Sequence, residues 1–262
     1  MHLQFDKYQG TGNDFILIDN RDSTVKLSVG QIAFLCNRRF GIGADGLMLL
    51  ENAEGYDFRM VYYNADGNES TMCGNGGRCI VAFAKKLGVI GNKASFIAID
   101  GPHTATVNED DTVSLQMQDV QEVLYADGYT QMNTGSPHYI MFVDDVNATD
   151  VFNTGRTIRN SERYQPKGIN VNFVQRLADG GIHVRTYERG VEDETYSCGT
   201  GVTAAAIAAS SNTAGHTITN IKTPGGNLQV SFDKRNANNI VNVILRGPAT
   251  YVYSGSIAVK EL

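Results

Sequence analysis

Two cysteines of this chain stand in matching sequence surroundings. Cys73 begins the run Cys-Gly-Asn-Gly, Cys198 begins the run Cys-Gly-Thr-Gly, and an apolar stretch rich in alanine and valine follows each. A glycine-rich turn that leads into a helix leaves backbone N–H groups and the positive end of the helix dipole beside the sulfur. Such a setting binds anions and lowers the pKa of a thiol from about 8.5 toward neutrality. The pattern predicts two activated thiols that act as a paired acid and base.

The other two cysteines fit the commoner role of a small buried hydrophobic residue. Cys36 lies in an apolar segment expected to form a helix over 31–37, and Cys79 lies inside the helix expected after Cys73. A disulfide between Cys73 and Cys79 is not expected, because residues six apart lie on different faces of a helix. The chain has no zinc-ligand spacing and no GxxxxGK[ST] loop, so we expect neither a metal nor a cofactor.

Two facing thiols suit the inversion of an amino-acid α-carbon. One thiolate removes the α-proton on one face and one thiol returns a proton on the other face, and the roles exchange in the reverse direction. The substrate carboxylate and the anionic intermediate need hydrogen-bond donors, which the backbone amides of Gly74-Asn75 and Gly199-Thr200 can supply. This design requires no pyridoxal cofactor.

Charged and polar residues near the second cysteine match the zwitterionic end of an amino acid. Arg189 can bind a carboxylate with two hydrogen bonds and Glu188 can hold an ammonium group. The same two residues could also form an ordinary ion pair on the exposed surface. Further candidates lie at expected loop ends, where ordinary turn or loop residues would also be found: Asn13, Asn64, Asn170 and His138.

Both halves of the chain repeat one plan. A strand is expected at Phe58–Asn64 before the first cysteine and at Ile182–Glu188 before the second. The two cysteines are 125 residues apart, and so are Asp19 and Asp144, each expected to end an apolar strand near the start of its half. An offset shared by separate features indicates a duplicated unit.

The segment after each cysteine is expected to be a helix. Gly76–Gly88 ends with two lysines and a glycine, which is a typical helix stop. Val202–Ala209 is apolar around most of its circumference, so it should be buried. Short alternating strands make up most of the rest: 14–20, 46–51, 95–100, 112–118, 171–177, 228–232 and 239–245.

These elements predict an α+β fold of two pseudo-symmetric domains, each a mostly antiparallel sheet wrapped around a central buried helix. The domains are expected at 1–119 and 120–248, with a C-terminal strand in 249–262 that returns to the first domain. No long linker separates the two, so we expect one active site in the cleft between them.

Bulk composition excludes several classes of function. The net charge of −6 gives no reason to expect nucleic acid or an anionic membrane as partner. No stretch approaches the ~18 apolar residues that span a bilayer, and the first residues do not have the pattern of a signal peptide. We expect a cytoplasmic protein with reduced thiols.

Several longer motifs, in the expected order and over essentially the whole chain, resemble those of the diaminopimelate epimerases. They are Gly10-Thr-Gly-Asn-Asp-Phe15, Tyr63-Asn-Ala-Asp-Gly67, Met72-Cys-Gly-Asn-Gly-Gly-Arg-Cys79, Tyr187-Glu-Arg-Gly190 and Glu194-Thr-Tyr-Ser-Cys-Gly-Thr-Gly201. The resemblance implies a cofactor-independent epimerase that interconverts LL- and meso-diaminopimelate on the bacterial route to lysine and peptidoglycan. Members of the family are commonly homodimers.

The resemblance also implies roles for individual residues. Cys73 and Cys198 would be the acid/base pair. The distal end of the substrate would be held by Asn13, Asn64, Asn170, Glu188 and Arg189. The reacting carboxylate would be held by Gly74, Asn75, Gly199 and Thr200, with His138 close by as a supporting residue.

The chain departs from the family pattern at three places: Gly46 stands where a glutamine is frequent, Ser136 where an asparagine is usual, and the loop 190–195 is one residue longer. Three other functions are open to these motifs. They are a proline or hydroxyproline racemase-type isomerase, a thiol redox protein, and a non-catalytic amino-acid-binding protein. The absence of CxxC weighs against the redox protein, and the Glu188-Arg189 pair favours a substrate longer than proline.

Overall fold

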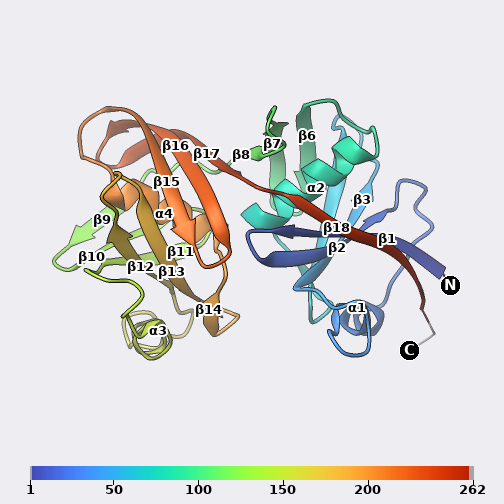
Figure 1. Cartoon of the computed structure of the whole chain (residues 1–262), viewed down its shortest axis with the longest axis horizontal. Coiled ribbons are helices and arrows are strands. Elements are labelled where there is room, and N and C mark those ends of the chain that lie inside the picture. The colour runs from blue at the N-terminus through green and yellow to red at the C-terminus, as the bar shows by residue number, and fades with distance from the viewer. Residues whose placement is uncertain (1, 260–262) are drawn as a thin grey trace. The chain divides into compact units, whose positions relative to one another are not determined.

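The computed structural model describes residues 2–259, and the two cysteine-led helices lie in separate structural units. One unit runs up to Leu115 and resumes at Pro248, and the other is Gln116–Gly247. Figure 1 labels the elements of both.

The first unit is built from strands and two helices. In chain order they are β1 (His2–Gly10), β2 (Asn13–Asp19), α1 (Val29–Cys36), β3 (Gly46–Glu51), β4 (Phe58–Asn64), β5 (Glu69–Ser70), α2 (Gly74–Lys86), β6 (Lys93–Ala98), β7 (Gly101–Val107), β8 (Val113–Gln116) and, from the end of the chain, β18 (Thr250–Ala258). The sheet order is β18-β1-β2-β3-β4-β6-β7-β8. Only the β2–β3 and β4–β6 pairs of this order are parallel.

The second unit repeats this order with its own strands. Its elements are β9 (Val123–Ala126), β10 (Tyr129–Asn133), β11 (Pro137–Phe142), α3 (Val151–Arg159), β12 (Asn170–Arg176), β13 (Ile182–Glu188), β14 (Asp193–Thr195), α4 (Gly199–Ala209), β15 (Gly215–Thr223), β16 (Gly226–Asn236) and β17 (Asn239–Gly247). The order β9-β10-β11-β12-β13-β15-β16-β17 has its parallel pairs, β11–β12 and β13–β15, at the same places. β18 thus takes in the first unit the place that β9 takes in the second.

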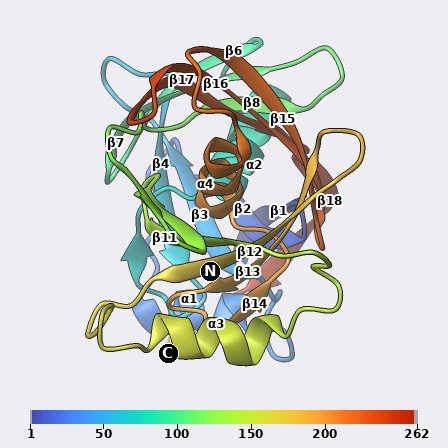
Figure 2. The same cartoon turned by 90° about the vertical axis from the view of Figure 1, so that its left-hand side faces the viewer.

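Each cysteine-led helix is the buried centre of its unit. α2 packs against β1, β2, β3 and β7, and α4 packs against β10, β11, β12, β13, β15 and β16. Figure 2 looks nearly along α4 and shows strands around it. The α4 sequence is apolar on nearly all sides, and its residues from Gly201 to Ala208 are all buried. The predicted α+β fold with a central buried helix in each half is confirmed.

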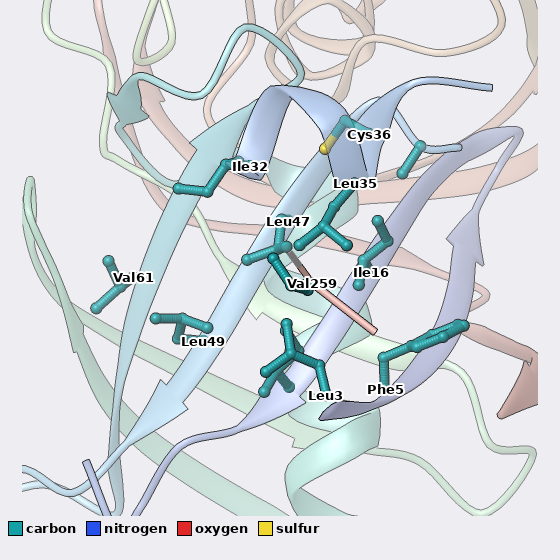
Figure 3. Packing of buried hydrophobic residues seen from close by; sticks show 12 residues of the cluster. Leu3, Phe5, Ile16, Ile32, Leu35, Cys36, Leu47, Leu49, Val61 and Val259 are labelled. Atoms are coloured by element: carbon teal, nitrogen blue, oxygen red, sulfur yellow. The ribbon is translucent and has the colours of Figure 1, made fainter. Parts of the chain in front are cut away.

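Strand β3 is covered on both faces, which explains why it reads as a continuous apolar run. On one face Leu47 and Leu49 pack in a cluster with α1, where Ile32, Leu35 and Cys36 lie (Figure 3). On the other face α2 covers the sheet. Cys36 is therefore part of the core, and burial raises the pKa of its thiol to about 12.

Two expectations about element ends need correction. The helices begin at Gly74 and Gly199, earlier than the expected Gly76 and Val202, so each cysteine is the N-cap of its helix. A glycine-rich first turn has low helix propensity, which hid these starts.

The expected end of the second apolar strand at Asp144 is also wrong, because β11 ends at Phe142. Thr11 and Thr134, which precede the glycines of the two hairpin turns, are 123 residues apart rather than 125. The duplication therefore has no single offset, because loops of different length separate its elements.

Candidate functional site

Cys73 caps the first turn of α2 with its own sulfur. The backbone N–H of Gly76 donates to Sγ at 3.2 Å, and the backbone of Cys73 is extended, as an N-cap requires. Gly76 leaves room for a neighbouring strand side chain, since a Cβ there would lie 2.5 Å from Cε of Met48 and 3.1 Å from the sulfur. The N–H groups at the start of a helix point out of its first turn toward the N-cap, which makes this end of α2 a position that favours an anion.

A cation lies buried one turn further along α2. The guanidinium of Arg78 is 0% exposed and donates to neutral oxygens of the described chain. They are the carbonyls of Gly74 (3.0 Å) and Pro248 (3.2 Å), Oδ1 of Asn75 (3.0 Å) and Oγ1 of Thr11 (3.2 Å). Burial lowers the pKa of Arg78 to about 10, so it still carries its charge at neutral pH. That charge favours an anion at the start of α2.

Asn13 and Asn75 meet at the turn between β1 and β2. Nδ2 of Asn75 donates to Oδ1 of Asn13 at 3.4 Å, and Nδ2 of Asn13 donates to the carboxylate of Asp45. Arg38 bridges Asp45 and Asp14 at 2.7 and 2.6 Å. Burial opposes ionisation of Asp14, but hydrogen bonds from Arg38 and from a buried lysine lower its pKa to about 2. Asn13 is thus held by a charged network rather than by a simple turn.

Asn64 lies exposed at the end of β4, opposite Gly46 in the β3–β4 ladder. A Cβ on Gly46 would lie 2.5 Å from Cε2 and 3.0 Å from Oη of Tyr62. The tyrosine ring therefore covers the position at which the family pattern frequently has a glutamine.

Cys198 caps α4 in a different way. Its Sγ lies 3.5 Å from Oγ1 of Thr200, within hydrogen-bond reach for sulfur, and its side chain accepts no capping N–H. The carbonyl of Thr200 accepts a hydrogen bond from Oγ1 of Thr134 at 2.8 Å. The hydroxyl of Thr200 is therefore a polar group within hydrogen-bond reach of this sulfur.

Behind Thr200 lies His138, which is 0% exposed. Nε2 of His138 is 2.9 Å from Oγ1 of Thr200, and Nδ1 is 3.1 Å from Nδ2 of Asn172. Burial, together with the positive charge of Arg189, lowers the pKa of His138 to about 3. The imidazole is neutral at physiological pH, so one of its nitrogens donates and the other accepts.

Asn170 and Arg189 meet around Ser136. Oδ1 of Asn170 accepts the backbone N–H of Arg189 at 2.9 Å, and its Nδ2 donates to Oγ of Ser136 at 2.9 Å. Nη2 of Arg189 donates to the same hydroxyl at 3.4 Å. Ser136, one of the three departures from the family pattern, therefore joins the two expected binding residues.

Glu188 and the longer loop after it are also anchored. Oε2 of Glu188 accepts from Oγ1 of Thr195 at 3.0 Å. Within the loop, Oε1 of Glu192 accepts from Nε of Arg159 in α3 and from the N–H of Gly190, each at 2.9 Å. The turn that carries Arg189 is thus tied to α3.

The structure brings expected residues together inside each unit: Asn13 with Asn75 in the first, and Cys198 with Thr200 and His138, and Asn170 with Arg189, in the second. Sequence reasoning missed Arg78 and Asn172. A signal existed for Arg78, which is a charged residue in a helix predicted to be buried. Asn172 lies in a predicted strand for which no burial was predicted, so nothing in the sequence singled it out.

Within 2–259 no group of three or more His, Cys, Asp or Glu side chains is placed to hold a metal ion. Among the helices of the same residues, none is long and apolar enough to cross a membrane.

Solved structures with the same fold define the class. A PhzF-family phenazine biosynthesis protein from Bacillus anthracis superposes with a TM-score of 0.76 over 99% of this chain and 100% of its own, at 13% identity. A hydroxyproline epimerase from Agrobacterium vitis superposes with a TM-score of 0.69 over 99% of this chain and 93% of its own, also at 13% identity. The fold is therefore the duplicated α+β fold of this class of proteins.

Sequence relatives define the family within that class. The family model described as diaminopimelate epimerase matches residues 5–123 and 130–252. The diaminopimelate epimerase of Flavobacterium psychrophilum is 57% identical over 96% of this chain and 98% of its own length. That of Chlorobaculum tepidum is 42% identical over 95% and 98%. The chain belongs to the diaminopimelate epimerase family and is an isomerase that acts on an amino acid.

Proposed function

We propose that this protein interconverts LL-2,6-diaminopimelate and meso-diaminopimelate by moving a proton at the α-carbon, in bacterial lysine and peptidoglycan precursor synthesis. The observation that carries the proposal is the pair of N-cap cysteines, Cys73 and Cys198, at the same place in two units of the same topology. A duplicated acid/base position is what an inversion needs, because one proton leaves and one arrives on opposite faces. No pyridoxal group takes part in this chemistry.

In the proposed mechanism one sulfur enters as thiolate and removes the α-proton, while the other enters as thiol and delivers a proton. Negative charge that develops on the reacting carboxylate is stabilised by first-turn N–H groups, which are already oriented before the reaction. The donors are the backbone amides of Gly74, Asn75, Gly199 and Thr200.

The second amino-acid end of the substrate is bound by charged and amide side chains. Arg189 binds the distal carboxylate and Glu188 binds the distal ammonium group. Amide side chains supply the remaining hydrogen bonds: Asn13, Asn64 and Asn170. The anchoring of Asn170 and Arg189 on Ser136 supports this assignment, since both are held in one place before substrate arrives.

Different groups support the two sulfurs. In the first unit the charge of Arg78 favours a thiolate on Cys73. In the second unit the hydroxyl of Thr200 contacts Cys198, and His138 supports that hydroxyl.

A matched turnover assay tests the substrate. Purified protein is given LL-diaminopimelate, L-proline or trans-4-hydroxy-L-proline, and inversion is followed by chiral chromatography. We expect turnover of LL-diaminopimelate alone. Turnover of proline or hydroxyproline alone would replace the proposal with a racemase of cyclic amino acids. Binding of an amino acid without turnover would support the non-catalytic binding protein. Reactivity only as a dithiol would support the thiol redox protein.

We further propose that the protein acts as a homodimer in the cytoplasm. Strand β18 pairs with β1 along one edge and exposes Tyr251, Val252 and Tyr253, at 45%, 50% and 42% of their surface. Apolar side chains along an exposed strand favour association with a second copy. Light scattering on the purified protein should give twice the chain mass, and a monomer at micromolar concentration would contradict this.

A further inference from the structure

Asn172 is buried in β12, where the sheet faces α4, and three side-chain hydrogen bonds surround it. Its Nδ2 lies 3.0 Å from the carbonyl oxygen of Tyr139 and 3.1 Å from Nδ1 of His138. Its Oδ1 accepts from Oγ1 of Thr186 at 3.0 Å. The side chain is 0% exposed.

These contacts leave Asn172 a single orientation. A backbone carbonyl can only accept a hydrogen bond, so the group that faces Tyr139 must be the amide nitrogen. The same nitrogen faces Nδ1 of His138, which must then be the accepting, unprotonated nitrogen. Because the buried imidazole is neutral, its proton is on Nε2.

The orientation of the Asn172 amide determines which group faces the sulfur of Cys198. Nε2–H of His138 donates to Oγ1 of Thr200 at 2.9 Å, so the hydroxyl proton of Thr200 is not used toward the histidine. That proton can be donated to Sγ of Cys198, 3.5 Å away. With the opposite tautomer, Thr200 would donate to His138 and the sulfur would face a lone pair.

We propose that Asn172 is a positioning residue that fixes the direction of this chain of hydrogen bonds, so that Thr200 presents a donor to Cys198. A hydrogen bond from a hydroxyl favours the thiolate over the thiol. The positive charge of Arg189 lowers the pKa of His138 and so disfavours the imidazolium form. The catalytic consequence rests on the acid/base role proposed for Cys198, but the tautomer does not.

Space around the helix supports a dedicated role for Asn172. A Cβ on Gly201 would lie 2.5 Å from Oδ1 of Asn172 and 3.4 Å from Sγ of Cys198. In the first unit the matching glycine, Gly76, faces Met48 instead. Met48 and Asn172 are each the third residue of the matching strands β3 and β12. The amide is therefore not a requirement of the fold at this place, because methionine serves there in the other unit.

The tautomer can be measured without substrate. Full-length protein labelled with 15N in its histidine rings is examined by long-range 1H–15N NMR at pH 7, and His138→Gln assigns the signal of interest. We expect Nε2 protonated and Nδ1 bare. A protonated Nδ1, as the other tautomer or as imidazolium, would overturn the proposal whatever the enzyme's substrate is.

Variants separate the effect of Asn172 from mere packing. In Asn172→Asp the carboxylate can only accept, so we expect the proton to appear on Nδ1. Thr186→Val is the matched control: it removes another hydrogen bond of Asn172 but leaves Tyr139 to orient the amide, and the tautomer should not change. An unchanged tautomer in Asn172→Asp would contradict the assignment.

The effect on Cys198 is measured by iodoacetamide alkylation across pH, in a Cys73→Ser background. Asn172→Met, which copies the first unit, should slow alkylation of Cys198 about tenfold at pH 7 and move the half-maximal rate to higher pH. Thr186→Val should stay within about twofold. An unshifted pH profile in a folded Asn172→Met protein would show that the hydrogen-bond chain does not act on the sulfur.

Discussion

The two units place their cysteines alike and surround them differently. Each sulfur belongs to the N-cap of a central helix, and a glycine three residues later allows a strand side chain to come close. In the first unit that side chain is Met48, and the polar support is the buried cation Arg78. In the second unit it is Asn172, and the support is a neutral hydrogen-bond chain.

The difference shows what duplication preserves. The helix start, with its N–H groups and dipole, is common to both units, because strand order and helix position fix it. The groups that favour a thiolate are not common, because they depend on single side chains. The two thiols are therefore chemically distinct, one supported by charge and one by a hydroxyl.

The largest effect is expected from removing either sulfur. Cys73→Ala and Cys198→Ala should each lower kcat for epimerisation about 10²- to 10⁴-fold, the contribution of a positioned acid or base. Circular dichroism should show an intact fold. Cys36→Ala changes a cysteine of the core cluster at α1, so it is the control and should keep kcat within about twofold. Comparable turnover in one of the two active-site variants would show that a single thiol suffices.

The charge in the first unit is tested by Arg78→Met, with Arg78→Lys as the variant that keeps the charge. Loss of a nearby positive charge disfavours a thiolate, so the acid limb of the kcat/KM profile should move to higher pH. At pH 7 we expect kcat/KM to fall about 10- to 100-fold in Arg78→Met and less in Arg78→Lys. A uniform loss in both variants with no change in the pH profile would mean that Arg78 only holds the packing.

Residues of the second unit should contribute more to binding of the distal end of the substrate than residues of the first unit. Arg189→Met removes a charged hydrogen-bonding partner worth about 1.5–3 kcal/mol and should raise KM about 10- to 100-fold. Asn64→Ala, at the end of the equivalent strand β4, should raise KM less. Equal effects of the two variants on KM would remove this distinction between the units.

The smallest effect is expected in stability, where the free energies of unfolding of Gly76→Ala and Gly201→Ala are compared by thermal or urea unfolding. The new methyl group in Gly76→Ala meets the mobile end of Met48, whereas in Gly201→Ala it meets the amide of Asn172, which hydrogen bonds hold in place. Alanine gains up to about 1 kcal/mol over glycine in a helix, which offsets the first clash. We expect Gly201→Ala to lower the free energy of unfolding by about 1–3 kcal/mol more than Gly76→Ala.

Local sequence patterns predicted much of the fold. Apolar alternation predicted β4 and β13, and the apolar circumference of α4 predicted its burial. The helix starts were predicted too late because glycine has a low helix propensity. Asp19 and Asp144 are not equivalent strand ends, because β11 ends before Asp144. Arg78 and Asn172 gain their roles from contacts between distant segments, which single-sequence patterns do not encode.

We propose that Cys73 and Cys198 act as two distinct thiols on opposite faces of one α-carbon. The most direct test follows the wild-type protein in D2O with LL-diaminopimelate and analyses substrate and product by mass spectrometry at early conversion. Because the base keeps the proton it removes and the other thiol delivers one from solvent, the meso product should carry one deuterium while remaining LL-diaminopimelate stays unlabelled. Product that retains the original α-hydrogen would contradict the account.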